Sequence, residues 1–242
     1  MSKSITYEDL AFLYAGFQSP LSTLDCGDKC APYNERNVPF CCDTRHAVPT
    51  AFQAEWEYLK TYSDMWHLVG EQTPTIPYKD VARLQVELPS DQVLVECQGY
   101  TLCQRNYRVL TCRAFPFFPY IQSNGEFIGL SYYWEYRHRC WIISNLRMVT
   151  PEYLTQFVLT YENLFVKMPQ ENDNFIEHAK EMRQNFVKHR RKVTLLHRDG
   201  YYYKINPATE ELHRVSGKNL PKFGVYQITA ALKFPDEEKD SD

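Results

Sequence analysis

The sequence has no apolar run long enough to cross a membrane, because no stretch of about 18 apolar residues occurs in it. Its first residues, MSKSITYEDLAFLYAGF, also lack the basic start and the long apolar segment of a signal peptide. We therefore expect a cytoplasmic protein with no membrane partner. Disulfides are uncommon in such a reducing compartment, so the cysteines of the chain need another explanation.

Strong charge of one sign is missing as well. The 242 residues carry a formal net charge of −3, which argues against extensive contacts to a phosphate backbone and predicts no nucleic-acid partner. A basic run at 188–192 ends a predicted helix, where cations suit the helix dipole. We find no internal repeat, no glycine-rich nucleotide loop and no local nucleophilic triad. Apolar residues make up 44% of the chain, so a core can form without disulfides.

Cysteine is absent after residue 140, although the part of the chain before it is rich in this residue. The eight cysteines are Cys26, Cys30, Cys41, Cys42, Cys97, Cys103, Cys112 and Cys140. Short spacings let one loop supply two or three metal ligands, and distant ligands then tie the loops together. Inert buried cysteines would be scattered, and a disulfide framework suits neither the expected compartment nor the large core. The pattern therefore predicts that all eight are metal ligands.

The cysteine-rich part is predicted to contain few regular elements. The segment 18–48 is interrupted by proline and glycine and carries four cysteines, so we expect a functional loop that a metal orders. Apolar spacing, capping residues and turn residues predict a helix at 6–15, an amphipathic helix at 50–69, strands at 81–88 and 93–98, and a hairpin at 117–133.

The carboxy-terminal part shows clear helical periodicity. We predict helices at 151–168 and 173–192, followed by a hairpin of 194–205 and 211–216. The predicted class is α+β. A cysteine-rich metal-binding domain of loops, helix and β-hairpin occupies 1–147, a helical pair with a β-hairpin occupies 148–232, and a disordered acidic tail occupies 233–242.

The order of the cysteines also carries a resemblance to a known family. Cys26 and Cys30 precede the adjacent pair Cys41-Cys42, and the later motifs are Cys97…Cys103, Cys112-Arg113-x-Phe115-Pro116 and Cys140. Over about residues 24–145 this resembles the YkgJ-like cysteine-cluster family, which is described as a zinc- or iron-chelating domain. The departures are a longer gap after Cys30, Val109-Leu110 where Arg-Pro is usual, and Trp141-Ile142 where Pro-Gly is usual. Flagellin lysine-N-methylases look distantly similar through the same cysteines.

The adjacent pair bears on the identity of the metal. Neighbouring side chains of an extended chain point to opposite sides, so one small tetrahedral zinc would need a sharp bend to take both thiols. A multi-iron cluster is larger, and eight thiols also equal two four-cysteine sets. We therefore favour an iron–sulfur cluster over zinc as the cofactor. Arg113, beside Cys112, is expected to bind this cofactor by offsetting its charge, the alternative being an ordinary arginine paired with a carboxylate.

Three functions fit these features. The first is a metal-binding protein acting in electron transfer, sensing or metal handling. The second is a cluster-dependent enzyme, such as one with a protein lysine methylase-like activity. The third is a structural zinc scaffold for a protein partner that the sequence does not identify. His46 and His138 lie near cysteines at usable spacing, but the thiols are already numerous enough to complete the sites without them.

Overall fold

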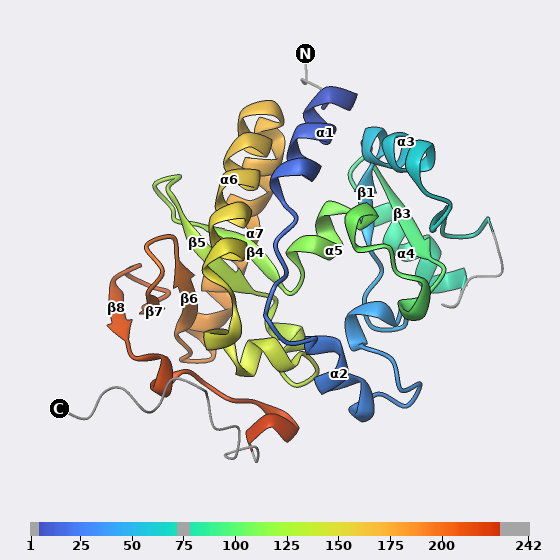
Figure 1. Ribbon diagram of the computed structural model, residues 1–242. Helices are drawn as coiled ribbons and strands as arrows, with labels where there is room; N and C mark the ends of the chain where they lie inside the picture. The colour runs from blue at the N-terminus through green and yellow to red at the C-terminus, as the bar shows by residue number, and fades with distance from the viewer. Residues whose placement is uncertain (1–4, 72–77, 228–242) are drawn as a thin grey trace.

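The chain combines helices with two antiparallel sheets, which confirms the α+β class in its coarse form. The computed structural model describes residues 5–71 and 78–227 (Figure 1). The smaller sheet has the strand order β1-β3-β2, and the larger has the order β4-β5-β6-β7-β8. The predicted tail at 233–242 lies outside the described residues. None of the described helices combines the length and the apolar character that crossing a membrane would require.

The first helix, α1 (Tyr7–Gly16), lies where the sequence predicts it. The Thr6 hydroxyl accepts a hydrogen bond from the Asp9 amide at 3.2 Å, and the Asp9 carboxylate accepts one from the Thr6 amide at 3.1 Å. This capping box satisfies two amides that the helix itself cannot satisfy. The helix packs between α3 (Gln53–Tyr62) and α6 (Pro151–Lys167).

The small sheet corrects two predictions. Its strands are β1 (Thr50–Phe52), β2 (Trp66–Leu68) and the central β3 (Gln92–Cys97). Only the middle part of the predicted helix at 50–69 is helical, because the two ends of that segment form strands that pair with β3. The predicted strand at 81–88 is instead part of a helix, α4 (Tyr78–Glu87). Val81, Leu84 and Leu88 pack together at helical spacing, whereas Val86 is 87% exposed.

The large sheet begins with the predicted hairpin, which is confirmed. Its strands are β4 (Phe117–Ile121), β5 (Phe127–Tyr132), β6 (Val193–His197), β7 (Tyr202–Ile205) and β8 (Leu212–Val215). The predicted final hairpin is thus a three-stranded meander. Gly129 pairs with His197, so β5 and β6 join segments from both sides of the predicted boundary at 147. A Cβ on Gly129 would lie 2.4 Å from the Leu196 carbonyl oxygen, so only glycine permits this close pairing.

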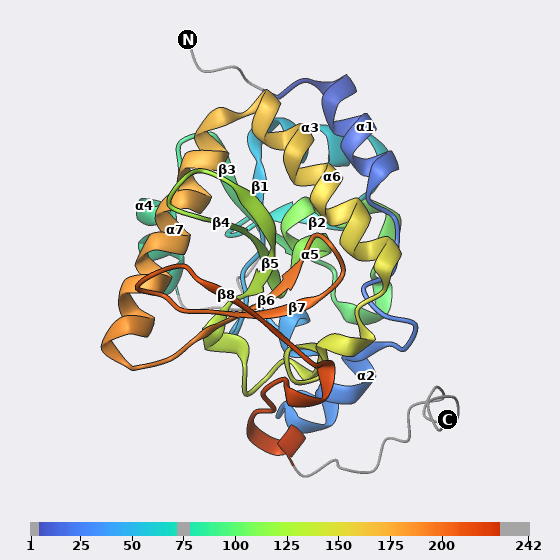
Figure 2. The ribbon, with the colours of Figure 1, turned by 90° about the vertical axis from the view of Figure 1, so that its left-hand side faces the viewer.

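Two long helices hold the sheet in place. The predicted helix at 151–168 is α6, and Thr150 caps it with Pro151 at the first position. The predicted helix at 173–192 is α7 (Pro169–Lys188), which begins four residues earlier and packs against β4. A second apolar cluster, including Phe118, Ala179 and Leu195, fills the space between α7 and the sheet. Figure 2 shows α6 running away from the end of the molecule that holds α2, and α7 starting at the far end and running back.

Candidate metal centre

The cysteines come from separate elements that meet below α5 (Leu110–Ala114) in Figure 1. Cys26 and Cys30 begin and end the short helix α2, Cys41 and Cys42 end a 3₁₀ turn, and Cys97 ends β3. Cys103 follows another 3₁₀ turn, Cys112 lies in α5, and Cys140 precedes the 3₁₀ turn at 141–144. All eight thiols are free, and none forms a disulfide.

The segment predicted as a loop at 18–48 contains local structure that positions its four thiols. Asp25 caps α2 by accepting from the Gly27 amide at 2.9 Å. The helical turn then places Cys26 and Cys30 on one face. A Cβ on Gly27 would lie 2.8 Å from Cγ of Pro39, so glycine lets the chain before the adjacent pair approach α2 closely.

The adjacent pair itself does not follow the expectation for an extended chain. The 3₁₀ turn at Phe40–Cys42 brings the two sulfurs to within 3.9 Å of each other. Sulfurs in a tetrahedral zinc site with 2.3 Å bonds are about 3.8 Å apart. The pair is therefore compatible with one zinc as well as with a cluster, and adjacency alone does not separate the two metals.

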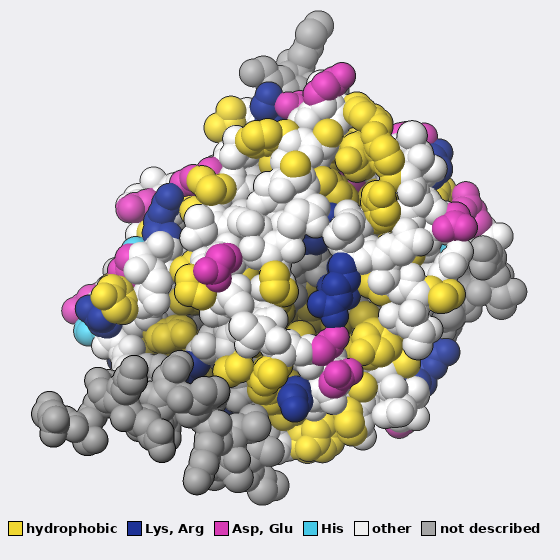
Figure 3. Space-filling model, viewed as in Figure 1, with side chains coloured by type: hydrophobic (Ala, Val, Ile, Leu, Met, Phe, Trp, Pro, Cys, Tyr) yellow, Lys and Arg dark blue, Asp and Glu magenta, His cyan; other side chains and the backbone are white. Residues whose placement is uncertain are grey.

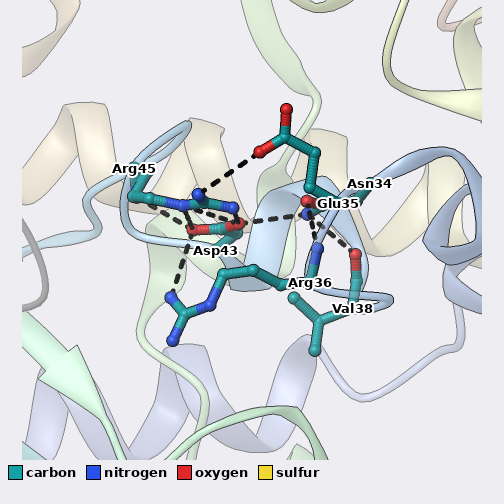
Figure 4. A network of polar contacts seen from close by, with 6 residues as sticks. All are labelled: Asn34, Glu35, Arg36, Val38, Asp43 and Arg45. Atoms are coloured by element: carbon teal, nitrogen blue, oxygen red, sulfur yellow. Dashed lines mark hydrogen bonds and ion pairs between the residues drawn. The ribbon is translucent and has the colours of Figure 1, made fainter.

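A network around Asp43 fixes the chain directly after the pair (Figure 4). The Asp43 side chain is fully buried and accepts hydrogen bonds from Arg45 Nη2 at 2.8 Å and from Asn34 Nδ2 at 3.1 Å. Arg36 contributes an ion pair at 3.7 Å. The hydrogen bonds from Arg45 outweigh burial and hold the pKa of Asp43 well below its usual range. The turn that presents Cys41 and Cys42 is thus fixed by charge rather than by apolar packing.

Electrostatic neighbours favour two groups of four thiols, although Cys30 also lies near Cys42 of the other group. Cys140 lies near Cys26 and Cys30, and Cys41 lies near Cys140 and Cys26. We call Cys26, Cys30, Cys41 and Cys140 the first thiol group. Cys112 lies near Cys42, Cys97 and Cys103, and these four form the second thiol group. The adjacent pair therefore contributes one thiol to each group, and the groups adjoin there.

Burial keeps most of these thiols protonated in the absence of metal. It raises the pKa of Cys26 to about 12, with the neighbouring Cys30 adding to the shift. Burial is also the main cause of the raised pKa of Cys112 and Cys140. For Cys42 the hydrogen bond from Cys41 lowers the pKa instead. A bound metal would therefore have to displace protons from most of its ligands.

Two cavities adjoin the thiols. The larger, which we call the thiol cavity, has a volume of about 330 Å³ and is lined in part by Cys41, Cys42, Cys97, Cys103 and Cys112. A smaller cavity of about 160 Å³ is lined by Cys26 as well, and its rim includes the ion pair of Arg105 with Asp25 at 2.6 Å. On the face drawn in Figure 3, basic and acidic side chains flank a hollow near the centre.

The thiols line a cavity and do not converge on one metal position. Among the described residues, no three His, Cys, Asp or Glu side chains are placed to hold a single metal ion. A metal ion would have to draw its ligands together, whereas a larger inorganic cluster would need less movement of the chain. The eight cysteines therefore stay predicted ligands.

Arg108, which the sequence analysis did not single out, places a positive charge beside the thiols. Its Nε donates a hydrogen bond to Cys103 Sγ at 3.1 Å. Burial opposes the charge of Arg108, but Cys103, Cys112 and Cys42 outweigh it and raise the pKa of the guanidinium above its usual value. A guanidinium in this position stabilises thiolates and any negative centre bound to them.

Arg113, the predicted cofactor-binding arginine, hydrogen-bonds to the backbone. It is 9% exposed and donates to the backbone carbonyls of Phe17, Tyr14, Asn106 and Arg108. Its guanidinium also stacks on Tyr14 at 4.2 Å from the ring centre. These contacts tie α5 to α1. The expected donation from Arg113 to sulfur is not among its hydrogen bonds to described residues.

The position of Arg108 gives a testable prediction. If the thiols hold the predicted cluster, Arg108→Gln should keep it but lower its reduction potential, because the more negative reduced state loses a nearby cation. We expect a shift on the order of 59 mV, the equivalent of a tenfold change for a one-electron couple. Redox titration followed by electron paramagnetic resonance measures it. Arg105→Gln is the matched control, since Arg105 is 59% exposed and its charge is screened. Equal shifts in both variants would contradict the assignment.

The two histidine candidates contact other groups. The His46 ring packs on Phe40 with centroids 5.0 Å apart, and burial lowers the pKa of His46. His138 is exposed and packs on Phe223 at 6.0 Å. Neither forms a hydrogen bond or ion pair with a cysteine of the described residues.

Comparison with known proteins adds no relative. No family model, curated protein or solved structure matches the chain. The resemblance to a cysteine-cluster family therefore stays a prediction that rests on the motifs alone.

Proposed function

We propose that this protein binds metal at its eight cysteines, as iron–sulfur clusters in preference to zinc, and acts in electron transfer, sensing or metal handling. The observation that carries the proposal is the gathering of eight free thiols, six of which line two adjoining cavities. Reduced cysteines that served only as core residues would not line cavities together. The resemblance to chelating proteins agrees with this proposal.

The two thiol groups support two centres with four thiolates each. Cys41 would ligate the first centre and Cys42 the second, so consecutive residues would link them. Four thiolates are the usual ligand set of both structural zinc and cubane clusters. Arg108 donates a hydrogen bond to Cys103 of the second thiol group. Its positive charge would therefore offset the negative charge of a centre in that group more than that of a centre in the first group.

The size of the thiol cavity favours a cluster over a single ion. A volume of about 330 Å³ beside five thiols is larger than one metal ion needs. The separation of 3.9 Å between the adjacent sulfurs is the feature that suits zinc. A structural zinc scaffold is therefore retained as an outcome of the test below.

The test is metal and sulfide analysis of protein purified without oxygen. We expect iron and acid-labile sulfide in equal amounts, with a broad visible absorption that dithionite bleaches. Stoichiometric zinc without sulfide would replace the iron–sulfur proposal with the zinc scaffold. Absence of any bound metal after anaerobic purification and after reconstitution would overturn metal binding altogether.

A cluster-dependent enzyme is the second candidate, because the thiol cavity continues beyond the cysteines. Its walls include Thr50, Thr111 and Tyr161, which leaves room for a substrate beside the centre. A methylase-like activity of the kind suggested by the sequence belongs to this candidate. A purely structural site has no need for such an extension.

A further inference from the structure

A second chamber adjoins the thiol cavity. This chamber has a volume of about 180 Å³ and shares five lining residues with the thiol cavity, so the two spaces adjoin. The shared residues are Thr50, Thr111, Tyr133, Tyr161 and Phe175. We call it the tyrosine chamber. No sulfur lines it, and it therefore has a chemistry distinct from that of the thiols.

Aromatic rings form the walls where the two spaces meet. Tyr161 meets Phe175 edge to face with centroids 5.6 Å apart. Tyr133 lies against Phe115 at 6.4 Å and against Phe118 at 5.1 Å. These contacts hold the rings in place without a ligand. Fixed aromatic faces attract cations through the negative potential above the ring.

The far part of the tyrosine chamber carries a carboxylate without a cationic partner. Glu171, in the first turn of α7, is 6% exposed. Its Oε1 accepts from Asn174 at 3.0 Å and from Gln92 at 3.3 Å, whereas its Oε2 has no hydrogen bond to a described residue. No lysine, arginine or histidine of the described residues forms an ion pair with it. Burial raises the pKa of Glu171, as expected for a carboxylate that lacks a counter-charge.

Glu55, the other carboxylate of the chamber, has a full set of partners. It accepts from the Leu110 amide at 2.6 Å, from the Tyr14 hydroxyl at 2.7 Å and from the Phe52 amide at 3.3 Å. Arg113 lies close enough to offset its charge. Glu55 thus uses both carboxylate oxygens to hold neighbouring segments together. Of the two carboxylates, only Glu171 has an oxygen, Oε2, without a hydrogen bond to a described residue.

The tyrosine hydroxyls add further acceptors. Those of Tyr133 and Tyr161 form no hydrogen bond with any described residue, although burial raises the pKa of both groups. Tyr133, Tyr161 and Glu171 all line this one chamber, so three oxygen atoms without a hydrogen bond to a described residue lie around it. A ligand that satisfies them must donate hydrogen bonds and carry positive charge, since a buried carboxylate calls for a cation.

We propose that the tyrosine chamber binds a small organic cation, an ammonium group on a short apolar chain. The ammonium lies against Glu171, and the chain runs along Tyr161 and Phe175 towards the thiol cavity. This places the apolar end of the ligand beside the second thiol group. The proposal does not depend on which metal the thiols hold.

Calorimetric titration of the full-length protein with three probes tests the charge requirement. The probes are n-butylammonium, its neutral isostere 1-butanol, and the anion butyrate. We expect n-butylammonium to bind at least about tenfold more tightly than 1-butanol, and butyrate not to bind. Equal affinity for the ammonium and the alcohol would overturn the proposal, as would tighter binding of butyrate.

Glu171→Gln tests the residue. The amide keeps an oxygen for Asn174 and Gln92 but loses the charge, and we expect at least about tenfold weaker binding of n-butylammonium. Glu177→Gln, on the exposed side of α7, should bind as wild type. Tyr133→Phe should bind n-butylammonium more weakly than wild type, because it loses one acceptor, and Tyr133→Leu should bind it more weakly still, because it also loses the aromatic face. Wild-type affinity in Glu171→Gln would overturn the assignment. If that variant does not fold, the comparison of the three probes still decides.

Discussion

Replacing Cys112 by serine is expected to remove metal from the second thiol group and to leave the first one loaded. A hydroxyl is a poor ligand for iron or zinc compared with a thiolate. Cys140→Ser should empty the first thiol group in the same way. Each single variant should therefore retain about half of the wild-type metal, and the double variant should retain none. Metal and sulfide analysis per protein chain measures the result.

The controls for this experiment come from the same region. His46→Ala should keep all of its metal, because His46 contacts Phe40 rather than a sulfur. Complete loss in either cysteine variant would mean that the eight thiols hold one shared centre. Full retention in Cys112→Ser would remove the central cysteine of the motif from the ligand set. Loss in His46→Ala alone would indicate a mixed Cys/His zinc site.

Removing the metal is expected to expose the segment 18–48 to proteolysis. The buried apolar side chains of this segment are few, namely Cys30, Ala31 and Pro39. Without metal its order depends on the Asp43 network and on a few contacts to neighbouring loops. Trypsin should therefore cleave after Arg36 and Arg45 at least about tenfold faster in the metal-free protein, as expected for local unfolding.

The helix α6 provides the internal comparison for this digestion. Phe157 is completely buried in it, and it lines neither of the two cavities beside the thiols. Its cleavage should stay slow with and without metal. Mass spectrometry of timed digests identifies the sites. Identical cleavage of the two forms at Arg36 and Arg45 would show that no metal holds the segment.

The helices α1, α6 and α7 and the first hairpin could be predicted because their signals are local. Thr6 and Asp9 close a box within one turn, and Pro151 follows a capping threonine. The errors arose where distant pairing decides the structure. Phe52 and Trp66 look helical by spacing but pair with β3, and the sequence around them does not reveal that partner. In the segment of α4, Val86 completes an alternating apolar pattern typical of a strand, although its side chain is exposed.

The candidate site was predictable in its composition but not in its arrangement. Cysteine spacing identified the thiols, since ligands cluster in sequence. The tight turn at Cys41 and Cys42 depends on Asp43, whose partners Arg36 and Arg45 look like ordinary charged surface residues. Arg108 could have been noticed as a cation four residues before Cys112. The tyrosine chamber had no sequence signal, because Tyr133, Tyr161 and Glu171 are far apart in the chain.

The pairing of β5 with β6 sets an order for the biosynthesis of this protein. All eight thiols precede β6 in the chain, and they leave the ribosome while β5 still has an open edge. Chains fold from the amino terminus as they emerge. A metal delivered at that stage would meet a complete set of ligands on a nascent chain whose large sheet cannot yet be finished. Cofactor loading can therefore be completed before the sheet closes, and maturation of the protein need not wait for its release.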